Sequence, residues 1–100
     1  MKRYSFTREN INKAPSAAGV YILYVGTETI YIGRAKGTTE TIRSRLSDHY
    51  HGRGSNGPCT KVATLYSREV TSTPVSREKE LQQAYVNRHG KLPRCNDRIG

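Results

Sequence analysis

The sequence predicts a small α/β domain in which a three-stranded antiparallel sheet is flanked by helices, with the elements in the order β-β-α-β-α. Three observations support this fold class. The chain has 100 residues, which is the length of one domain. Two runs of β-branched and aromatic residues, 20–25 and 30–33, lie close enough together to form a hairpin. Two later segments carry apolar residues at helical spacing, and a strand-like segment separates them.

The N-terminal segment, residues 1–15, is polar, and we expect an arm or a short helix there. Thr7 is a suitable N-cap because its hydroxyl can accept a hydrogen bond from the first helical turn. Pro15 and the small residues up to Gly19 interrupt this segment. The first strand of the hairpin is then expected over residues 20–25, and a short turn leads into the second.

The first long helix is expected after a short loop, with Thr38 or Thr39 as its N-cap. Ile42 and Leu46 lie four residues apart, so they share one face of this helix. The helix has to end before residues 52–58, a glycine-rich stretch that favours a flexible loop.

The C-terminal part is expected to hold one more strand and one more helix. Residues 62–67 alternate apolar and polar side chains, which is typical of a strand. Residues 75–89 repeat apolar side chains with the helical period. Gly90 suits the C-cap position, and Pro93 prevents the helix from continuing. Residues 1–100 are therefore predicted to form one domain.

The chain is strongly basic, with 17 Lys and Arg residues against 8 Asp and Glu residues and a formal net charge of +9. This charge favours polyanionic partners. Nucleic acid leads among them, because Lys and Arg displace counterions from phosphates. An anionic surface is a weaker candidate, and no apolar run reaches the length of a membrane span. We therefore expect an intracellular, cytoplasmic protein without a membrane partner.

The two cysteines, Cys59 and Cys95, are too few for a disulfide scaffold, so we expect both to be reduced thiols. Together with His49 and His51 they could in principle ligate zinc. Their spacing is irregular and contains no closely spaced cysteine pair, which makes a zinc site a weak alternative.

Four short motifs follow one another along the chain. Gly19-Val20-Tyr21 opens the first strand, and Tyr31-Ile32-Gly33 closes the second. Arg45 and His49 come next, four residues apart on one helix face. Pro93-Arg94-Cys95-Asn96 lies near the C-terminus. In this order the motifs resemble those of the GIY-YIG nuclease family, and the resemblance covers almost the whole chain.

The resemblance implies a GIY-YIG fold and a metal-dependent endonuclease that hydrolyses DNA phosphodiester bonds with one divalent ion, Mg²⁺ or Mn²⁺. It also implies roles for particular residues. The expected catalytic residues are Tyr21, Tyr31, Arg34, Arg45 and His49, the supporting residues are Gly19, Gly33 and Asn96, and the DNA-binding residues are Lys36, Arg43, His51 and Arg53.

Elementary chemistry is compatible with these roles. A free tyrosine has a pKa near 10 and is a poor base at neutral pH, but a neighbouring arginine and a metal ion would lower the pKa of Tyr21. Tyr31 is expected to orient water or phosphate. The planar guanidinium of Arg45 can pair with two phosphate oxygens. His49 can act as a base, as an acid for the leaving group, or as a phosphate donor.

The metal ligand has three candidates. The family places one Glu on the helix after the third strand, with apolar residues at +3, +4 and +7. Glu78, Glu80 and Gln82 each meet this pattern in part, and Gln82 has the most suitable separation from Asn96. A neutral amide is a poor substitute for a carboxylate as a ligand of Mg²⁺. Three interpretations stay open: Glu78 or Glu80 binds the ion, the domain is a catalytically inactive nucleic-acid-binding module, or Gln82 replaces a Glu of the active chain.

The substrate is expected to be double-stranded or single-stranded DNA. A homodimer on DNA would allow both strands of a duplex to be cut. The motif set after Met1 favours a free-standing protein.

Overall fold

The computed structural model describes residues 1–99. The elements follow one another as β1 (Tyr4–Ser5), α1 (Arg8–Asn12), β2 (Gly19–Val25), β3 (Glu28–Ala35), α2 (Ile42–Tyr50), α3 (Gly57–Thr60), β4 (Leu65–Val70) and α4 (Pro74–His89).

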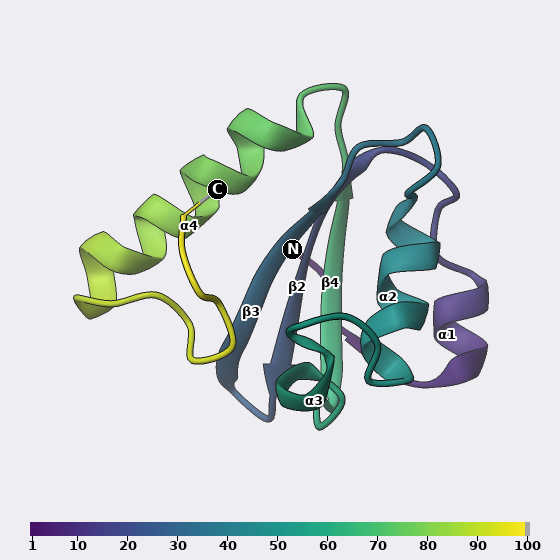
Figure 1. Cartoon of the computed structure of the whole chain (residues 1–100), viewed down its shortest axis with the longest axis horizontal. Coiled ribbons are helices and arrows are strands. Elements are labelled where there is room, and N and C mark those ends of the chain that lie inside the picture. Colours follow the sequence, from purple (N-terminus) through teal and green to yellow (C-terminus); the bar gives the residue numbers. More distant parts are fainter. Residues whose placement is uncertain (100) are drawn as a thin grey trace.

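The strands form one antiparallel sheet in the order β1-β4-β2-β3. The predicted hairpin is the pair β2–β3, in which Tyr21 lies opposite Gly33 and Leu23 lies opposite Tyr31. Helices α1 and α2 lie on one side of the sheet and α4 lies on the other (Figure 1). The α/β class and the hairpin are therefore confirmed, and β3 is an edge strand.

The sheet has four strands where the sequence predicted three. The additional strand, β1, is only two residues long and pairs with β4. Its side chain Tyr4 stacks on Tyr66, with the ring centroids 5.3 Å apart. A strand this short has no periodicity of its own, and contacts to a distant part of the chain hold it in place. The short helix predicted next to it is present as α1, and Thr7 caps it by accepting a hydrogen bond from the backbone N–H of Asn10.

Three predicted boundaries differ from the observed ones. Helix α2 is capped by Thr41 rather than Thr38 or Thr39, because Thr41 and Ser44 form a reciprocal capping box. The stretch 52–58, predicted to be a loop, leads into the short helix α3. The third predicted strand is shifted towards the C-terminus, since Val62 is exposed and the backbone of β4 pairs with β2 as far as Val70.

The main hydrophobic core lies between the sheet and helices α1 and α2. Its largest members share almost complete burial: Tyr21, Leu23, Ile30, Ile42, Leu46 and Tyr66. In the part of the chain that the structure describes, no helix has the length and apolar character needed to cross a membrane.

The cysteines are not reduced thiols, and this prediction was wrong. Cys59 in α3 and Cys95 in the C-terminal segment form a disulfide, with their Cα atoms 5.7 Å apart. The two residues are 36 positions apart in the sequence, so only the fold brings them together. A zinc site that includes these cysteines is thereby ruled out.

The two motif glycines are needed for close packing. A Cβ atom at Gly33 would lie 2.6 Å from the Tyr21 hydroxyl and from the Tyr31 ring, which is too close for any side chain. A Cβ atom at Gly19 would lie 2.6 Å from Ile42 of α2 and would overlap the backbone of Glu69. The supporting role predicted for both glycines therefore has a steric basis, and Gly33 in particular leaves room for the two tyrosines.

Candidate active site

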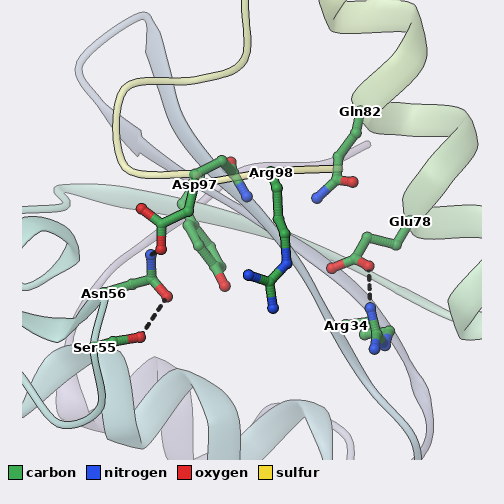
Figure 2. Close-up of a pocket in the computed structure, with 9 residues that line it drawn as sticks. Arg34, Ser55, Asn56, Glu78, Gln82, Asp97 and Arg98 are labelled. Atoms are coloured by element: carbon green, nitrogen blue, oxygen red, sulfur yellow. Dashed lines mark hydrogen bonds and ion pairs between the residues drawn. The ribbon is translucent and has the colours of Figure 1, made fainter. Parts of the chain in front are cut away.

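The candidate site lies at the open edge of β3, between α2 and α3 on one side and α4 on the other. The C-terminal segment after Pro93 returns to this edge and completes the site (Figures 1 and 2). Strands β2 and β3, helices α2, α3 and α4, and the C-terminal segment all contribute side chains, so the fold brings together motifs that are separate in the sequence.

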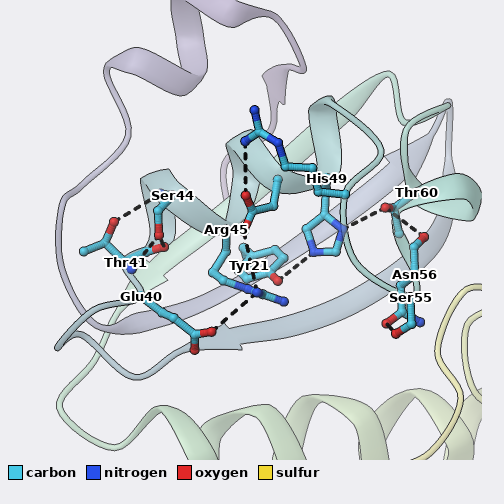
Figure 3. A network of polar contacts seen from close by, with 11 residues as sticks. Tyr21, Glu40, Thr41, Ser44, Arg45, His49, Ser55, Asn56 and Thr60 are labelled. Carbon is cyan, nitrogen blue, oxygen red and sulfur yellow. Dashed lines mark hydrogen bonds and ion pairs between the residues drawn. The ribbon is translucent and has the colours of Figure 1, made fainter.

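A buried hydrogen bond joins the first tyrosine to the histidine. The hydroxyl of Tyr21 lies 2.8 Å from Nε2 of His49, and both residues are buried. Nδ1 of His49 lies 2.7 Å from Oγ1 of Thr60 (Figure 3). The ring of Tyr31 packs against His49, with the centroids 4.8 Å apart. The fold therefore brings Tyr21, Tyr31 and His49 together as the sequence predicted.

Burial controls the protonation of these groups. It raises the pKa of Tyr21, an effect that nearby Tyr31 reinforces, while Arg45 acts in the opposite direction. Burial also lowers the pKa of His49 to about 4, and the positive charge of Arg45 adds to this effect. The expectation that Arg45 lowers the pKa of Tyr21 is correct in direction, but burial dominates. At neutral pH Tyr21 keeps its proton and His49 is an uncharged acceptor.

Arg45 stands beside this pair at the rim of the site. Its positive charge favours the ionised form of the Tyr21 hydroxyl, which acts against the effect of burial on the pKa of Tyr21. It also makes two long ion pairs, at 3.5 Å to Glu40 and 3.7 Å to Asp48. Its side chain is 30% exposed, so one side of the guanidinium remains accessible from solution.

Glu78 and Arg34 form an ion pair across the site, from α4 to β3, at 2.5 Å. The Glu78 side chain is only 6% exposed. A recess of about 290 Å³ contains both side chains together with Tyr31 and Gln82. A neighbouring recess of about 260 Å³ shares Tyr31, Arg34 and Glu78 and extends to Arg45. The polar surface therefore runs without a break from Arg45 to Gln82.

Gln82 and Asn96 hold the backbone of β3. Asn96 accepts a hydrogen bond from the N–H of Ile32 at 2.9 Å and donates one to its carbonyl at 3.0 Å. The buried Gln82 amide donates to the same carbonyl at 3.1 Å. The supporting role predicted for Asn96 thus corresponds to a specific pair of hydrogen bonds.

The three candidate metal ligands are not equivalent. Glu80 is exposed on α4 and does not reach the recess, whereas Glu78 and Gln82 both line it. A carboxylate and an amide oxygen are hard ligands that suit Mg²⁺, which usually binds one or two carboxylates and keeps several waters. Among residues 1–99 no group of three His, Cys, Asp or Glu side chains is arranged to hold a metal.

The predicted DNA-binding residues divide into two groups. Lys36 lines the recess beside Arg45, and Arg53 is exposed while pairing with Asp48 at 3.3 Å. His51 is exposed at the end of α2. Arg43 instead points to the far side of α2, where its Nε donates to the carbonyl of Ala14 at 2.8 Å. Arg43 does not line the recess, and its predicted contact with DNA stays a prediction.

Sequence reasoning missed part of the site. Ser55, Asn56, Asp97 and Arg98 line the recess, and Figure 2 shows the Arg98 side chain reaching into it between Asp97 and Glu78. The missed residues belong to the loop before α3 and to the C-terminal segment, which have no periodic pattern. The polar run that continues the terminal motif beyond Asn96 was the available signal for Asp97 and Arg98.

Comparisons with known proteins agree with this geometry. No protein-family model matches the chain. UvrABC system protein C of Deinococcus radiodurans is 43% identical over 49 residues, which is 49% of this chain and 7% of that protein. The chain therefore corresponds to a small part of this curated relative.

Solved structures match more of the chain. The GIY-YIG N-terminal endonuclease domain of UvrC from Thermotoga maritima, bound to its catalytic divalent cation magnesium, is 22% identical and has a TM-score of 0.61. The match covers 91% of this chain and all of that domain. A point mutant of the same domain bound to its catalytic divalent cation is 23% identical over 92% of this chain, also with a TM-score of 0.61. The chain has the GIY-YIG fold, as its motifs predicted.

Proposed function

We propose that this chain is an endonuclease that hydrolyses DNA phosphodiester bonds with the help of one divalent metal ion, Mg²⁺ or Mn²⁺. The observation that carries the proposal is the buried Tyr21–His49 hydrogen bond, which lies behind Tyr31. Tyr31 and Arg45 in turn line the recess that contains Glu78. The similar fold of domains described as bound to a catalytic divalent cation supports it. The net charge of +9 is appropriate for a DNA partner.

Arg45 has the chemistry of the group that stabilises the transferred phosphate. Its guanidinium is permanently charged and can pair with two phosphate oxygens. The ion pairs to Glu40 and Asp48 are long, so a phosphate can compete with them for the same nitrogens. Because charge on the phosphoryl oxygens grows in the transition state, such a donor stabilises the transition state more than the bound substrate.

Tyr21 and His49 work as a pair in water activation. Burial raises the pKa of Tyr21, so the tyrosine does not lose its proton to solvent at neutral pH. Its hydroxyl can pass that proton to Nε2 of His49 while the phenolic oxygen takes one from water. Arg45 stabilises the negative charge on Tyr21 during this exchange. Tyr31, packed on His49, completes the wall of the recess.

Glu78 is the residue proposed to hold the metal ion, with the amide oxygen of Gln82 in the same recess as a second donor. A bound ion would stabilise charge on the phosphoryl group and lower the pKa of a coordinated water. One ion is proposed because Glu78 is the one buried carboxylate among the described residues that line the recess. The ion would replace Arg34 as the partner of Glu78.

A second candidate function is a DNA-binding module without catalysis. Two observations favour it: Gln82, the candidate with the most suitable separation from Asn96, is a neutral amide, and Arg34 already neutralises Glu78. Such a module would bind DNA through the basic recess and would not cleave it.

One site cuts one strand. We therefore expect nicking of duplex DNA by a monomer and cleavage of both strands only by a homodimer. Cellular DNA as a substrate also implies an intracellular, cytoplasmic protein. The Cys59–Cys95 disulfide is unusual for that compartment.

The direct test is cleavage of supercoiled plasmid and of single-stranded DNA with Mg²⁺ or Mn²⁺, with and without a chelator. The wild-type chain should nick the plasmid only when the metal is available. Arg45→Ala should lose cleavage by about 100-fold or more, as expected for removal of a transition-state donor. Arg88→Ala is a matched control, because it removes one exposed arginine of α4 outside the recess.

The outcomes separate the two candidates. Chelator-sensitive nicking that is lost in Arg45→Ala and retained in Arg88→Ala supports the endonuclease. Salt-dependent binding of DNA without cleavage in either metal supports the binding module and rejects the enzyme.

A further inference from the structure

The strongest feature outside the predicted site is the position of Thr60. We propose that Thr60 is a positioning residue that fixes the tautomer of His49, so that Nε2 of His49 is the atom that accepts the Tyr21 proton. The expected effect on kcat rests on the proposed nuclease function, whereas the assignment of the His49 tautomer does not.

Thr60 is fully buried at the end of α3. Its Oγ1 lies 2.7 Å from Nδ1 of His49, 3.1 Å from the carbonyl of Asn56 and 3.4 Å from the carbonyl of Gly57. Figure 3 shows Thr60 on the side of the imidazole that faces away from Tyr21. Thr60 therefore contacts the base, while Tyr21 is on the other side of the ring.

The chain of hydrogen bonds begins at the Tyr21 hydroxyl, which lies 2.8 Å from Nε2 of His49. A hydroxyl can donate or accept, so this contact by itself fits either tautomer of His49. Transfer of the Tyr21 proton to His49 requires an unprotonated Nε2.

The other end of the chain is acceptor-only. The carbonyl oxygens of Asn56 and Gly57 accept the hydroxyl proton of Thr60, as Ser and Thr side chains commonly bond to the preceding turn of a helix. Oγ1 of Thr60 then offers a lone pair to His49. A neutral imidazole with unprotonated Nε2 carries its proton on Nδ1, and that proton is donated to Oγ1. The Thr60 end of the chain therefore fixes the tautomer that proton transfer from Tyr21 needs.

The tautomer matters because a neutral imidazole accepts a proton at only one nitrogen. With the proton on Nδ1, the acceptor Nε2 faces Tyr21. Once Nε2 has accepted a proton, both nitrogens donate, and Thr60 still satisfies the Nδ1 proton. Without the Thr60 hydroxyl, the buried Nδ1–H has no described partner, and the ring favours the tautomer with the proton on Nε2, which blocks the transfer.

The first measurement reads the tautomer directly. NMR of ¹⁵N-histidine-labelled wild-type protein at pH 7 should show the Nδ1–H tautomer for His49, because the nitrogen shifts of the two tautomers differ. Thr60→Val is nearly isosteric and removes the hydroxyl, so it should shift His49 towards the Nε2–H tautomer. Thr60→Ser keeps the hydroxyl and should retain the wild-type tautomer.

The second measurement is plasmid nicking by the same variants. Thr60→Val should lower kcat by about tenfold or more, within the range of general-base contributions, with KM within about twofold of wild type. Thr60→Ser should recover most of kcat. An Nε2–H tautomer in the wild-type protein, or unchanged tautomer and kcat in folded Thr60→Val, would overturn the proposal.

Failure of the two proposals can be told apart. If the wild-type protein shows the expected tautomer and does not cleave DNA, the nuclease proposal fails while the assignment of Thr60 stands. If the wild type cleaves DNA and Thr60→Val cleaves it equally well, the positioning role fails alone. A Thr60→Val protein that does not fold leaves the wild-type tautomer as the deciding measurement.

Discussion

Reduction of the Cys59–Cys95 disulfide should strongly destabilise this domain. The bond joins α3 to the C-terminal segment and encloses β4 and α4 between its ends. Its two cysteines immediately precede Thr60, which contacts His49, and Asn96, which holds the backbone of β3. The cross-link therefore restrains the two segments that complete the site.

The magnitude follows from the length of the closed loop. For a separation of 36 residues, the chain-entropy model gives a stabilisation of about 4 kcal/mol at 25 °C. Small domains have unfolding free energies of roughly 5–15 kcal/mol in total. The loss would shift the melting temperature of a domain of this size by more than about 10 °C.

The assay is urea unfolding at pH 7, followed by circular dichroism, with and without a phosphine reductant. The reductant should lower the urea midpoint of the wild-type protein. The double variant Cys59→Ala/Cys95→Ala should start from the lower midpoint and should not respond to reductant. Equal midpoints for the oxidised and reduced wild-type protein, with the redox state checked by thiol labelling, would refute the reasoning.

Three further predictions concern the site itself. Because folded His49 has its pKa lowered to about 4 and unfolded histidine titrates near 6.5, only the unfolded state takes up this proton between those values. The free energy of unfolding should therefore fall as the pH drops through this window. The fall between pH 7 and pH 4 should be larger in the wild-type protein than in His49→Gln, by on the order of 3 kcal/mol. Urea unfolding of both proteins at the two pH values measures this difference. Gln82→Glu adds a carboxylate beside Glu78 and should tighten Mg²⁺ binding by about tenfold or more in calorimetry. The control Gln83→Glu changes the exposed neighbour on α4 and should leave the Mg²⁺ affinity unchanged. Equal Mg²⁺ affinities of Gln82→Glu and the wild-type protein would show that position 82 is not part of the metal site. Tyr21→Phe keeps the ring and removes the hydroxyl, so it should abolish nicking while DNA affinity in a salt titration stays within about twofold; retained nicking would contradict the role of Tyr21.

The sequence predicted best those features that depend on residues close together in the chain. The hairpin could be predicted because β-branched and aromatic residues fill both strands, and the short turn leaves only an antiparallel pairing. Arg45 and His49 could be placed together because helical spacing alone puts them on one face of α2. Gly33 could be associated with the site through its motif, and the structure adds that a Cβ there would meet the rings of both tyrosines.

Other features depend on contacts between distant segments, which no local pattern encodes. Strand β1 is held in place by the stacking of Tyr4 on Tyr66. The disulfide can form because the fold places α3 beside the C-terminal segment. The choice between Glu78 and Glu80 needed the direction in which α4 faces the sheet, because the two residues lie only two positions apart and point to different sides of the helix.

Asn96 has a consequence for how this molecule behaves at high concentration. Its side-chain amide bonds to both the N–H and the carbonyl of Ile32, and the N–H of Cys95 bonds to the carbonyl of Ile30 at 2.9 Å. A side chain thus imitates the neighbouring strand that β3 lacks. Exposed strand edges are templates for pairing between molecules, and covering them protects against aggregation. We therefore expect Asn96 to hinder pairing between copies of the chain along β3, through the same two hydrogen bonds that hold Ile32 in place.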